Sequence, residues 1–225
     1  MKIAALISGG KDSLYAAYQA CKNNELKCLI TLKSVNPESY MFHIPNIELV
    51  KLQARAMKLP LIFKKTLGVK EEELKDLENA IKIAIKKYKI KGLVSGAIES
   101  NYQKERIENI CEKLGIKSIT PLWHINKESY IKSLIKKFSI IITGIAADSL
   151  SKEDLGKEYN LDFIKKIKQL DVSLIGEGGE FESLVLDCPL FRKKIEIEKA
   201  AIEMESEFSG TYIIKKARLI KNNRS

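Results

Sequence analysis

Short apolar runs alternate with longer amphipathic stretches through the first 120 residues of the chain. The apolar runs, which predict strands, are Lys2–Ile7, Leu26–Leu32, Leu61–Phe63 and Leu93–Val94. The amphipathic stretches, which predict helices, are Ser13–Cys21, Asn46–Met57, Lys70–Tyr88 and Asn101–Leu114. Strands that alternate with helices of about ten or more residues are typical of parallel βαβ units. The pattern therefore predicts an α/β fold with a doubly wound, mainly parallel sheet.

The second half of the chain has a different pattern. Helices are expected over Lys127–Lys137 and within Ser151–Gln169, where Ser151 is the expected N-cap and Asp154 the third helical position. The expected strands are Ser139–Ala146, Leu184–Leu186, Ile195–Ile197, Ile202–Phe208 and Tyr212–Leu219, with a hairpin turn at Ser209-Gly210. We therefore expect two domains, residues 1–120 with the parallel sheet and residues 121–225 with a smaller α+β arrangement.

Charge and cysteine usage limit the functional classes. The formal net charge is +10, and residues 1–120 carry most of it, with 21 Lys and Arg against 13 Asp and Glu. That excess favours an anionic ligand, but the charges are spread along the chain, so nucleic acid binding is not expected. No run approaches the ~20 apolar residues of a membrane span, and the first residues do not resemble a secretory leader. Four scattered cysteines and two histidines favour neither a structural zinc site nor a disulfide framework, so a cytoplasmic protein is expected.

The segment Ser8-Gly9-Gly10-Lys11-Asp12-Ser13 lies between the first expected strand and the first expected helix. An open α/β sheet binds ligands there, at the carboxyl ends of its strands. Glycines let backbone N–H groups approach an anion, and the following helix N-terminus favours phosphate. Lys11 adds a point charge, and Asp12 is the candidate ligand for Mg²⁺. The spacing differs from both the GxxxxGK[ST] and the GxGxxG phosphate-binding motifs.

This segment resembles the PP-loop of the ATP pyrophosphatases, which cleave ATP between its α and β phosphates. The resemblance implies that a substrate oxygen attacks the α-phosphate, that pyrophosphate leaves, and that a nucleophile then attacks the adenylated substrate. Some members of that superfamily deliver ammonia, and others deliver sulfur to tRNA.

A second unusual segment is Glu177-Gly178-Gly179-Glu180-Phe181-Glu182. If Phe181 faces the protein, strand alternation sends Glu180 and Glu182 to the opposite side together. Paired carboxylates can bind a metal, hold an ammonium group or act as a general base, although a solvated acidic turn has the same composition.

Two further segments, residues 95–106 and 41–46, lie where the predicted fold could place side chains near the first motif or in the core. Residues 95–106 follow the fourth expected strand and enter a helix, so their loop is expected beside the first motif, across the switch point of the sheet. Gln103 and Arg106 are three residues apart, which puts them on one helix face, as in an ordinary surface pair. His43, in the segment 41–46, is more typical of a hydrogen-bonded structural histidine than of a catalyst.

Taken together, these segments resemble the diphthine–ammonia ligase family of PP-loop enzymes. The segments that carry the resemblance are SGGKDS (8–13), MFHIPN (41–46), GAIESNYQKERIENICEKLGI (96–116), PLW (121–123), GIAADSL (144–150) and GEGGEFESLVLDCPLF (176–191). The last is the most specific of them. Because the sequence ends without the added C-terminal domains of eukaryotic relatives, we expect it to resemble the short archaeal form.

The resemblance implies a reaction in which ATP, ammonia and diphthine on translation elongation factor 2 give diphthamide, AMP and pyrophosphate. It implies an ATP-binding domain over residues 1–120 and a substrate-binding domain over residues 121–225. ATP and Mg²⁺ are the implied cofactors, with ATP held by the residues of segment 8–13 and by Ser95, Gly96 and Ala97. The implied catalytic residues are Lys11, Asp12, Glu180 and Glu182. The implied acceptor-binding residues are Tyr102, Gln103, Arg106, Glu177, Gly178, Gly179, Glu180 and Glu182.

Two alternatives remain open from the sequence. One is a tRNA-modifying PP-loop ATP pyrophosphatase, which the basic first half would suit, although a sulfur relay normally needs paired reactive cysteines. The other is a nucleotide-binding regulatory module without turnover, against which the carboxylate-rich second motif argues. A homodimer is also compatible with the sequence.

Overall fold

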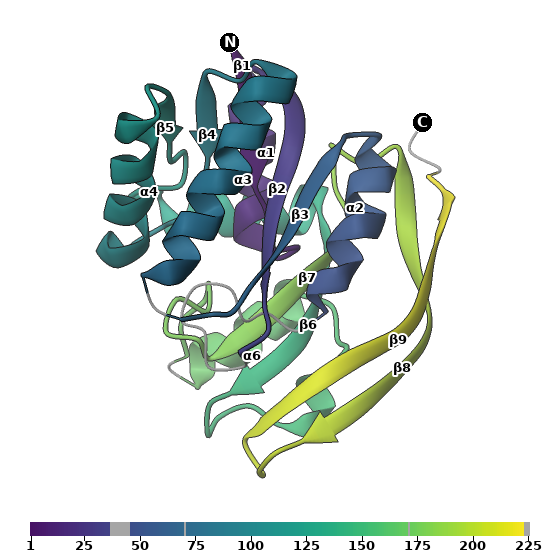
Figure 1. The fold of residues 1–225 in the computed structure, drawn as a ribbon. Helices are drawn as coiled ribbons and strands as arrows, with labels where there is room; N and C mark the ends of the chain where they lie inside the picture. Colours follow the sequence, from purple (N-terminus) through teal and green to yellow (C-terminus); the bar gives the residue numbers. More distant parts are fainter. Residues whose placement is uncertain (37–45, 70, 171, 223–225) are drawn as a thin grey trace.

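The computed structural model describes residues 1–36, 46–69, 71–170 and 172–222, so segment 41–45 with His43 lies outside the described residues. The expected parallel sheet is present, in the order β3-β2-β1-β4-β5 (Figure 1). Its strands are β1 (Lys2–Leu6), β2 (Glu25–Ser34), β3 (Leu61–Thr66), β4 (Gly92–Val94) and β5 (Lys117–Ile119). All four neighbouring pairs run parallel. The prediction of a doubly wound α/β sheet is confirmed, and β5 is a strand that the sequence analysis did not predict.

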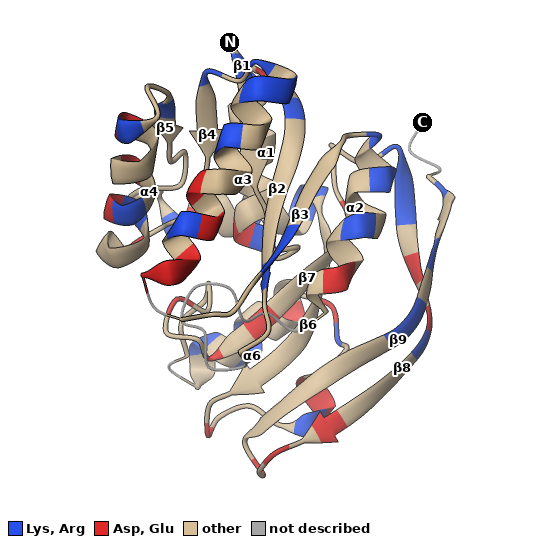
Figure 2. Cartoon of the chain, in the orientation of Figure 1, with Lys and Arg blue, Asp and Glu red and all other residues tan. Residues whose placement is uncertain are grey.

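The helices of this half connect the parallel strands. They are α1 (Lys11–Ala20), the short 3₁₀ helix η1 (Ile47–Leu49), α2 (Val50–Met57), α3 (Glu72–Tyr88) and α4 (Asn101–Lys113). The expected start of the first helix at Ser13 was wrong, because Lys11 and Asp12 already belong to its first turn. Helix α3 begins acidic and ends basic, which complements its dipole (Figure 2).

Side chains from the central strand alternate between two hydrophobic clusters. Ala4 joins residues of α3 and α4 on one face of the sheet, whereas Ile3 and Ala5 join residues of α1 and α2 on the other. The alternation follows from the two-residue period of a strand. Because helices cover both faces, the strands read as nearly continuous apolar runs in the sequence.

A second sheet, antiparallel and in the order β7-β6-β9-β8, lies on the side of α1 and α2 (Figure 1). Its strands are β6 (Ser139–Ala146), β7 (Phe181–Asp187), β8 (Lys193–Met204) and β9 (Ser209–Lys221). The helices of this half are α5 (Lys127–Lys137), the 3₁₀ helix η2 (Lys152–Asp154) and α6 (Leu161–Gln169). The N-cap prediction is confirmed, since Ser151 and Asp154 form a capping box.

The C-terminal hairpin differs from its prediction. The two separate strands expected near 195–197 and 202–208 are one strand, β8, whose pairing with β9 shifts register around Lys199. Such a bulge interrupts the two-residue alternation that the sequence analysis relied on. The turn was also misplaced, because Ser209 and Gly210 already belong to β9 and residues 205–208 make the connection.

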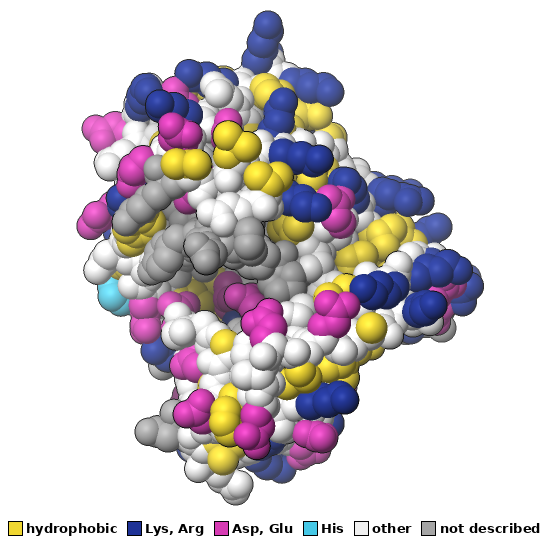
Figure 3. Space-filling model, turned by 60° about the horizontal axis from the view of Figure 1, so that its bottom comes forward, with side chains coloured by type: hydrophobic (Ala, Val, Ile, Leu, Met, Phe, Trp, Pro, Cys, Tyr) yellow, Lys and Arg dark blue, Asp and Glu magenta, His cyan; other side chains and the backbone are white. Residues whose placement is uncertain are grey.

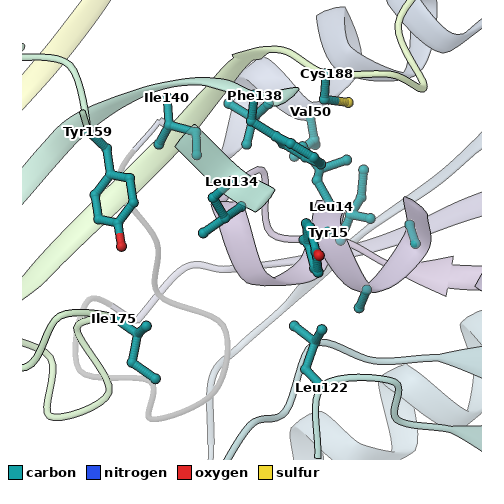
Figure 4. Close-up of a cluster of buried hydrophobic side chains, with 14 of the residues drawn as sticks. Leu14, Tyr15, Val50, Leu122, Leu134, Phe138, Ile140, Tyr159, Ile175 and Cys188 are labelled. Carbon is teal, nitrogen blue, oxygen red and sulfur yellow. The ribbon is translucent and has the colours of Figure 1, made fainter. Parts of the chain in front are cut away.

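One hydrophobic cluster joins the two halves of the chain. Leu14 and Tyr15 of α1 lie in it beside Phe138, which follows α5, and Ile140 of β6 (Figure 4). The second sheet is therefore packed directly against the helix that begins at the predicted phosphate-binding segment. No helix within the described residues is long and apolar enough to cross a membrane.

Candidate active site

The first motif forms a tight turn that ends at the N-terminus of α1. Gly9 has a positive φ of +92°, a conformation that favours glycine. The turn is closed by Ser8 and Ser13, whose hydroxyl oxygens are 3.1 Å apart, and the Ser8 N–H donates to the Ser13 hydroxyl at 3.2 Å. Gly10 is the N-cap of α1 and has no side chain to cap the helix, and the neutral Ser183 hydroxyl, which accepts the Lys11 N–H, adds no negative charge there. The positive end of the helix dipole is therefore available to an anion.

Gly96 brings the loop after β4 onto this helix N-terminus. A β-carbon at Gly96 would stand 2.8 Å from the backbone N and Cα of Ser13, closer than real contacts allow. Only a glycine permits this approach. The expectation that segment 95–97 lies beside the first motif is confirmed, because β4 neighbours β1 and Gly96 packs on α1.

A cavity of about 190 Å³ opens at this junction. It is lined by Leu6, Ile7, Ser8, Asp12, Ser13, Leu32, Ile47, Ser95, Gly96, Ala97, Gln103 and Ile107. One part of the lining is aliphatic, and the other is the hydroxyl-rich turn at the head of α1. The buried Ser95 hydroxyl has no hydrogen-bond partner among the described residues, and a buried polar group of this kind calls for one. A ligand with an apolar ring at one end and a polar or anionic group at the other fits such a lining.

Lys11 points from the first motif toward the second. Its side chain is 4% exposed, and its ammonium donates to Asp12 Oδ2 at 2.9 Å and to the backbone oxygen of Ile175 at 2.6 Å. The same ammonium lies 5.4 Å from the centroid of the Phe181 ring. Lys11 therefore joins the N-terminus of α1 to the segment that precedes β7.

Asp12 accepts hydrogen bonds at both carboxylate oxygens. Lys11 donates to Oδ2, and the hydroxyl of Tyr130, on α5, donates to Oδ1 at 2.5 Å. Burial, reinforced by the Asp12 charge, raises the pKa of Tyr130 well above its ordinary value, so its hydroxyl stays protonated and donates. The sequence analysis did not identify Tyr130.

Two glutamates of the second motif share this electrostatic environment. The pKa of Glu182 is raised because the surrounding protein removes water from its carboxylate, although Lys11 opposes the shift. Partial burial, reinforced by the Asp12 charge, also raises the pKa of Glu177. Acidic side chains gather around the hollowed centre of the face at the carboxyl ends of the strands (Figure 3).

The strand geometry places Glu182 as expected. Phe181 is buried, so the alternate residue Glu182 faces away from the core, opposite Gly144 of β6. A β-carbon at Gly144 would meet Glu182 Cβ at 3.1 Å, so the glycine gives the glutamate room to lie across β6. Glu180 precedes β7, and its carboxylate accepts a hydrogen bond from the Gly178 N–H at 2.9 Å. The Glu180 carboxylate is therefore held within the turn that precedes the strand.

The predicted residues of α4 lie in two different places. Gln103 lines the cavity together with Ser95, Gly96 and Ala97. Arg106 instead pairs with Glu71 at 2.6 Å and lies 3.5 Å over the Tyr102 ring, outside the cavity lining. Gly179 has a positive φ of +82° and, like Gly178, is exposed in the turn before β7.

Gln53, a residue of α2, links the two motifs and was not predicted. It is fully buried, and its amide donates to the backbone oxygens of Gly9 and Val185, each at 2.9 Å. The Val185 N–H donates to the same Gly9 oxygen, and the Lys11 N–H donates to the Ser183 hydroxyl. These bonds tie the turn of the first motif to β7.

The surroundings of the cysteine and acidic side chains bear on two other kinds of chemistry, a thiol nucleophile and a metal site built from protein side chains alone. All four cysteines are free thiols, and burial raises the pKa of Cys28 to about 12 and of Cys111 to about 11. Buried thiols of this kind are poor nucleophiles. Among the residues that the structure describes, no three His, Cys, Asp or Glu side chains gather as a metal site.

Family models match both halves of the chain. A model described as the diphthamide synthase N-terminal domain matches residues 1–118, and one described as the diphthamide synthase C-terminal domain matches residues 126–220. Among solved structures, a chain described as a predicted subunit of tRNA methyltransferase from Methanocaldococcus jannaschii has a TM-score of 0.43 and 17% identity, covering 84% of this chain and 97% of that one. A likeness at that level says nothing about activity.

Curated proteins named diphthine–ammonia ligase are similar over nearly the whole chain. Those of Mus musculus and Homo sapiens are each 34% identical to it, across 92% of this chain and 86% of theirs. The Schizosaccharomyces pombe protein is 32% identical across 92% of this chain but only 38% of its own length. Added length is therefore not a feature of all eukaryotic relatives. With both family models matched and these relatives aligned, the chain belongs to the diphthamide synthase family, that of the diphthine–ammonia ligases.

Proposed function

We propose that this protein is a diphthine–ammonia ligase, an enzyme that uses ATP and ammonia to amidate diphthine on translation elongation factor 2. The observation that carries the proposal is that its curated relatives, 34% identical over 92% of the chain, have that name. The geometry supports it, because an anion-binding turn and a carboxylate motif meet at Lys11 and Asp12.

The nucleoside of ATP would occupy the cavity at the head of α1. This adenosine would lie against Leu6, Leu32 and Ile107, and the unpartnered hydroxyl of Ser95 would bond a polar group of the nucleoside. The phosphates would meet the N-terminus of α1, whose N-cap Gly10 has no side chain, and the serines of the turn, where backbone N–H groups favour anions. Gln103 belongs to this nucleotide side of the site by its position in the lining.

Asp12 is the residue that would hold Mg²⁺. The ion usually takes one or two protein carboxylates and completes its shell with phosphate oxygens and water, so Asp12 together with the phosphates of ATP fits it. The ion would neutralise charge on the phosphates.

The acceptor would bind on the side of the second motif. The diphthine carboxylate oxygen attacks the α-phosphorus, and the bond to pyrophosphate breaks. Ammonia then attacks the acyl carbon, AMP leaves, and the nitrogen gives up a proton. Glu177 and Glu182 suit the quaternary ammonium of diphthine and that proton, since a raised carboxylate pKa improves a general base near neutral pH.

Lys11 lies where these two halves of the reaction meet. Its ammonium is held by Asp12 on the nucleotide side and by the oxygen of Ile175 on the acceptor side. A fixed cation there would stabilise charge that develops on the α-phosphate oxygens. Glu180, which is held within the turn, would shape the acceptor side through Gly178.

The finer features of the proposal follow from the same observations. Residues 1–120 would form the ATP-binding domain and residues 121–225 the substrate-binding domain, and their shared hydrophobic cluster would keep them together. We expect the enzyme to act in the cytoplasm, where its free thiols would persist.

We also expect a homodimer, because β8 is an edge strand that a second copy could extend. Sedimentation velocity would test this expectation.

A tRNA-modifying role is not favoured. The curated relatives are diphthine–ammonia ligases, and burial raises the pKa values of Cys28 and Cys111, which opposes a thiolate relay.

The test is a reaction of the protein with ATP, ammonium and diphthine-bearing elongation factor 2. Mass spectrometry of the factor should show replacement of a carboxyl OH by NH₂, and chromatography should show AMP and pyrophosphate. Formation of ADP and phosphate, or an unmodified factor in the presence of AMP release, would contradict the proposal. The variant Asp12→Ala is the inactive control.

A further inference from the structure

Tyr130, on α5 in the second half of the chain, holds the carboxylate of Asp12 in the candidate site. Its hydroxyl donates to Asp12 Oδ1, while Lys11 donates to Oδ2, so each carboxylate oxygen has one protein donor. A carboxylate oxygen has two lone pairs, so one on each oxygen is left for another partner.

The position of Tyr130 follows from the packing of α5. Tyr130, Ile131 and Leu134 form the buried face of that helix, and the Tyr130 ring packs edge-on against Tyr15 of α1 with centroids 4.8 Å apart. The Tyr130 side chain is fully buried, and a buried phenol needs a hydrogen-bond acceptor. Asp12, 118 residues earlier in the chain, is that acceptor. The ring is thus part of the core, whereas the hydroxyl reaches the site.

We propose that Tyr130 is a positioning residue that fixes the Asp12 carboxylate for the cation bound with ATP. The inference rests on the proposed use of ATP with Mg²⁺. Groups that donate to a ligating carboxylate orient it, and their removal typically weakens metal affinity or activity by about 10- to 100-fold. Tyr130 differs from Lys11 in that it contributes a neutral donor, so its loss changes the orientation of Asp12 without changing the net charge of the site.

The chain provides a matched control in Tyr159. This tyrosine is also buried, at 1% exposure, and it lies in the same hydrophobic cluster. Its hydroxyl donates instead to the backbone oxygen of Leu174 at 2.7 Å, and it points toward the segment of Ile175 in Figure 4. Tyr159→Phe therefore removes a buried hydroxyl and a hydrogen bond near Asp12 but leaves the donors to Asp12 in place.

The first experiment measures binding and needs no acceptor. Affinity for a non-hydrolysable ATP analogue is determined by calorimetry, with and without MgCl₂, for the wild-type protein, Tyr130→Phe and Tyr159→Phe. Tyr130→Phe should lose about 10- to 100-fold of the Mg²⁺-dependent affinity and keep metal-free affinity within about twofold. Tyr159→Phe should keep both. Because elongation factor 2 is absent, this result is independent of the acceptor that the enzyme amidates.

The second experiment asks whether Tyr130 acts through Asp12. In an Asp12→Asn background, Tyr130→Phe should cause no further loss of Mg²⁺-dependent affinity, because the carboxylate that it orients is absent. An equal loss in both backgrounds would overturn the proposal. So would a Tyr130→Phe protein that binds Mg²⁺ and nucleotide like Tyr159→Phe, with thermal unfolding showing both variants folded.

Discussion

Gly96 is the position where the structure gives the sharpest steric prediction. A β-carbon there would lie 2.8 Å from the N and Cα atoms of Ser13 and 3.0 Å from the carbonyl carbon of Asp12, whereas ordinary contacts begin at 3.4 Å. All three atoms belong to backbone, so no side chain can rotate away, and the loop must retreat by roughly half an ångström from α1. Overpacking of this kind costs about 1–3 kcal/mol.

The displacement of segment 95–97 should weaken the affinity of the protein for nucleotide. Segment 95–97 lines the cavity together with Ser8 and Ser13, so moving it disturbs both walls of the proposed nucleotide site at once. If the whole cost of about 1–3 kcal/mol falls on the bound state, Gly96→Ala weakens the affinity for a non-hydrolysable ATP analogue by between about 5-fold and about 140-fold, since 1.4 kcal/mol is a factor of ten. Calorimetry measures that affinity, and urea denaturation measures the free energy of unfolding.

Gly115→Ala is the matched control. Gly115 ends α4 with a positive φ of +65°, and nothing lies within 4 Å of where its β-carbon would be. Alanine in that conformation costs about 1 kcal/mol of stability without touching the cavity. Gly115→Ala should therefore lower the free energy of unfolding and leave nucleotide affinity unchanged. Wild-type affinity and stability in Gly96→Ala would refute the steric argument.

Three further outcomes are expected. Lys11→Ala and Asp12→Ala should each lower kcat by at least ~10²-fold, which is the scale of removing one electrostatic group from the transition state. Gln19→Ala, on the same helix, should keep a rate near that of the wild-type protein. Equal rates in all three variants would show that the first motif is only a structural turn. A cysteine-free variant should retain turnover, with packing losses at its buried positions; a folded but inactive variant would revive a thiol mechanism. Glu182→Gln should raise the free energy of unfolding at pH 7, because the raised pKa means that ionised Glu182 is disfavoured in the folded state. That gain should shrink as the pH falls through the raised pKa of Glu182 and disappear once the pH is below the ordinary pKa of a carboxyl group, which urea denaturation at pH 7 and pH 4 measures.

The fold was largely predictable because its helices are long and its central strands are buried. Helix α3 shows a complete amphipathic period over Glu72–Tyr88, and the buried strands read as apolar runs. Strand β5 was missed because Lys117–Ile119 is three residues long and partly exposed at the edge of the sheet. The hairpin was misjudged because the register shift around Lys199 breaks the alternation on which a strand prediction depends.

The meeting of the segments that form the candidate site was predictable where their residues are contiguous in the sequence. Segments 8–13 and 95–97 meet because parallel strands bring their carboxyl ends to one edge, which the strand order alone implies. Tyr130 could not be found in this way, because a tyrosine on the apolar face of a helix is typical of a core residue. Gln53 did leave a signal, since it occupies an apolar-stripe position of α2 beside Val50, Ala54 and Met57. A polar side chain in such a stripe needs a buried partner.

The position of Lys11 changes the electrostatic argument about the two motifs. The family resemblance assigned Lys11 to the segment that holds ATP and the glutamates of the second motif to the acceptor, and carboxylates and phosphates repel each other. In the structure the Lys11 ammonium contacts Asp12 and Ile175, and its charge opposes the raised pKa of Glu182. A cation at that junction would let an anionic nucleotide and two carboxylates occupy neighbouring halves of the proposed site. It also requires that Lys11→Ala act on both halves: such a variant should lose affinity for nucleotide and raise the pKa of Glu182 further, a coupling that two separate sites would not show.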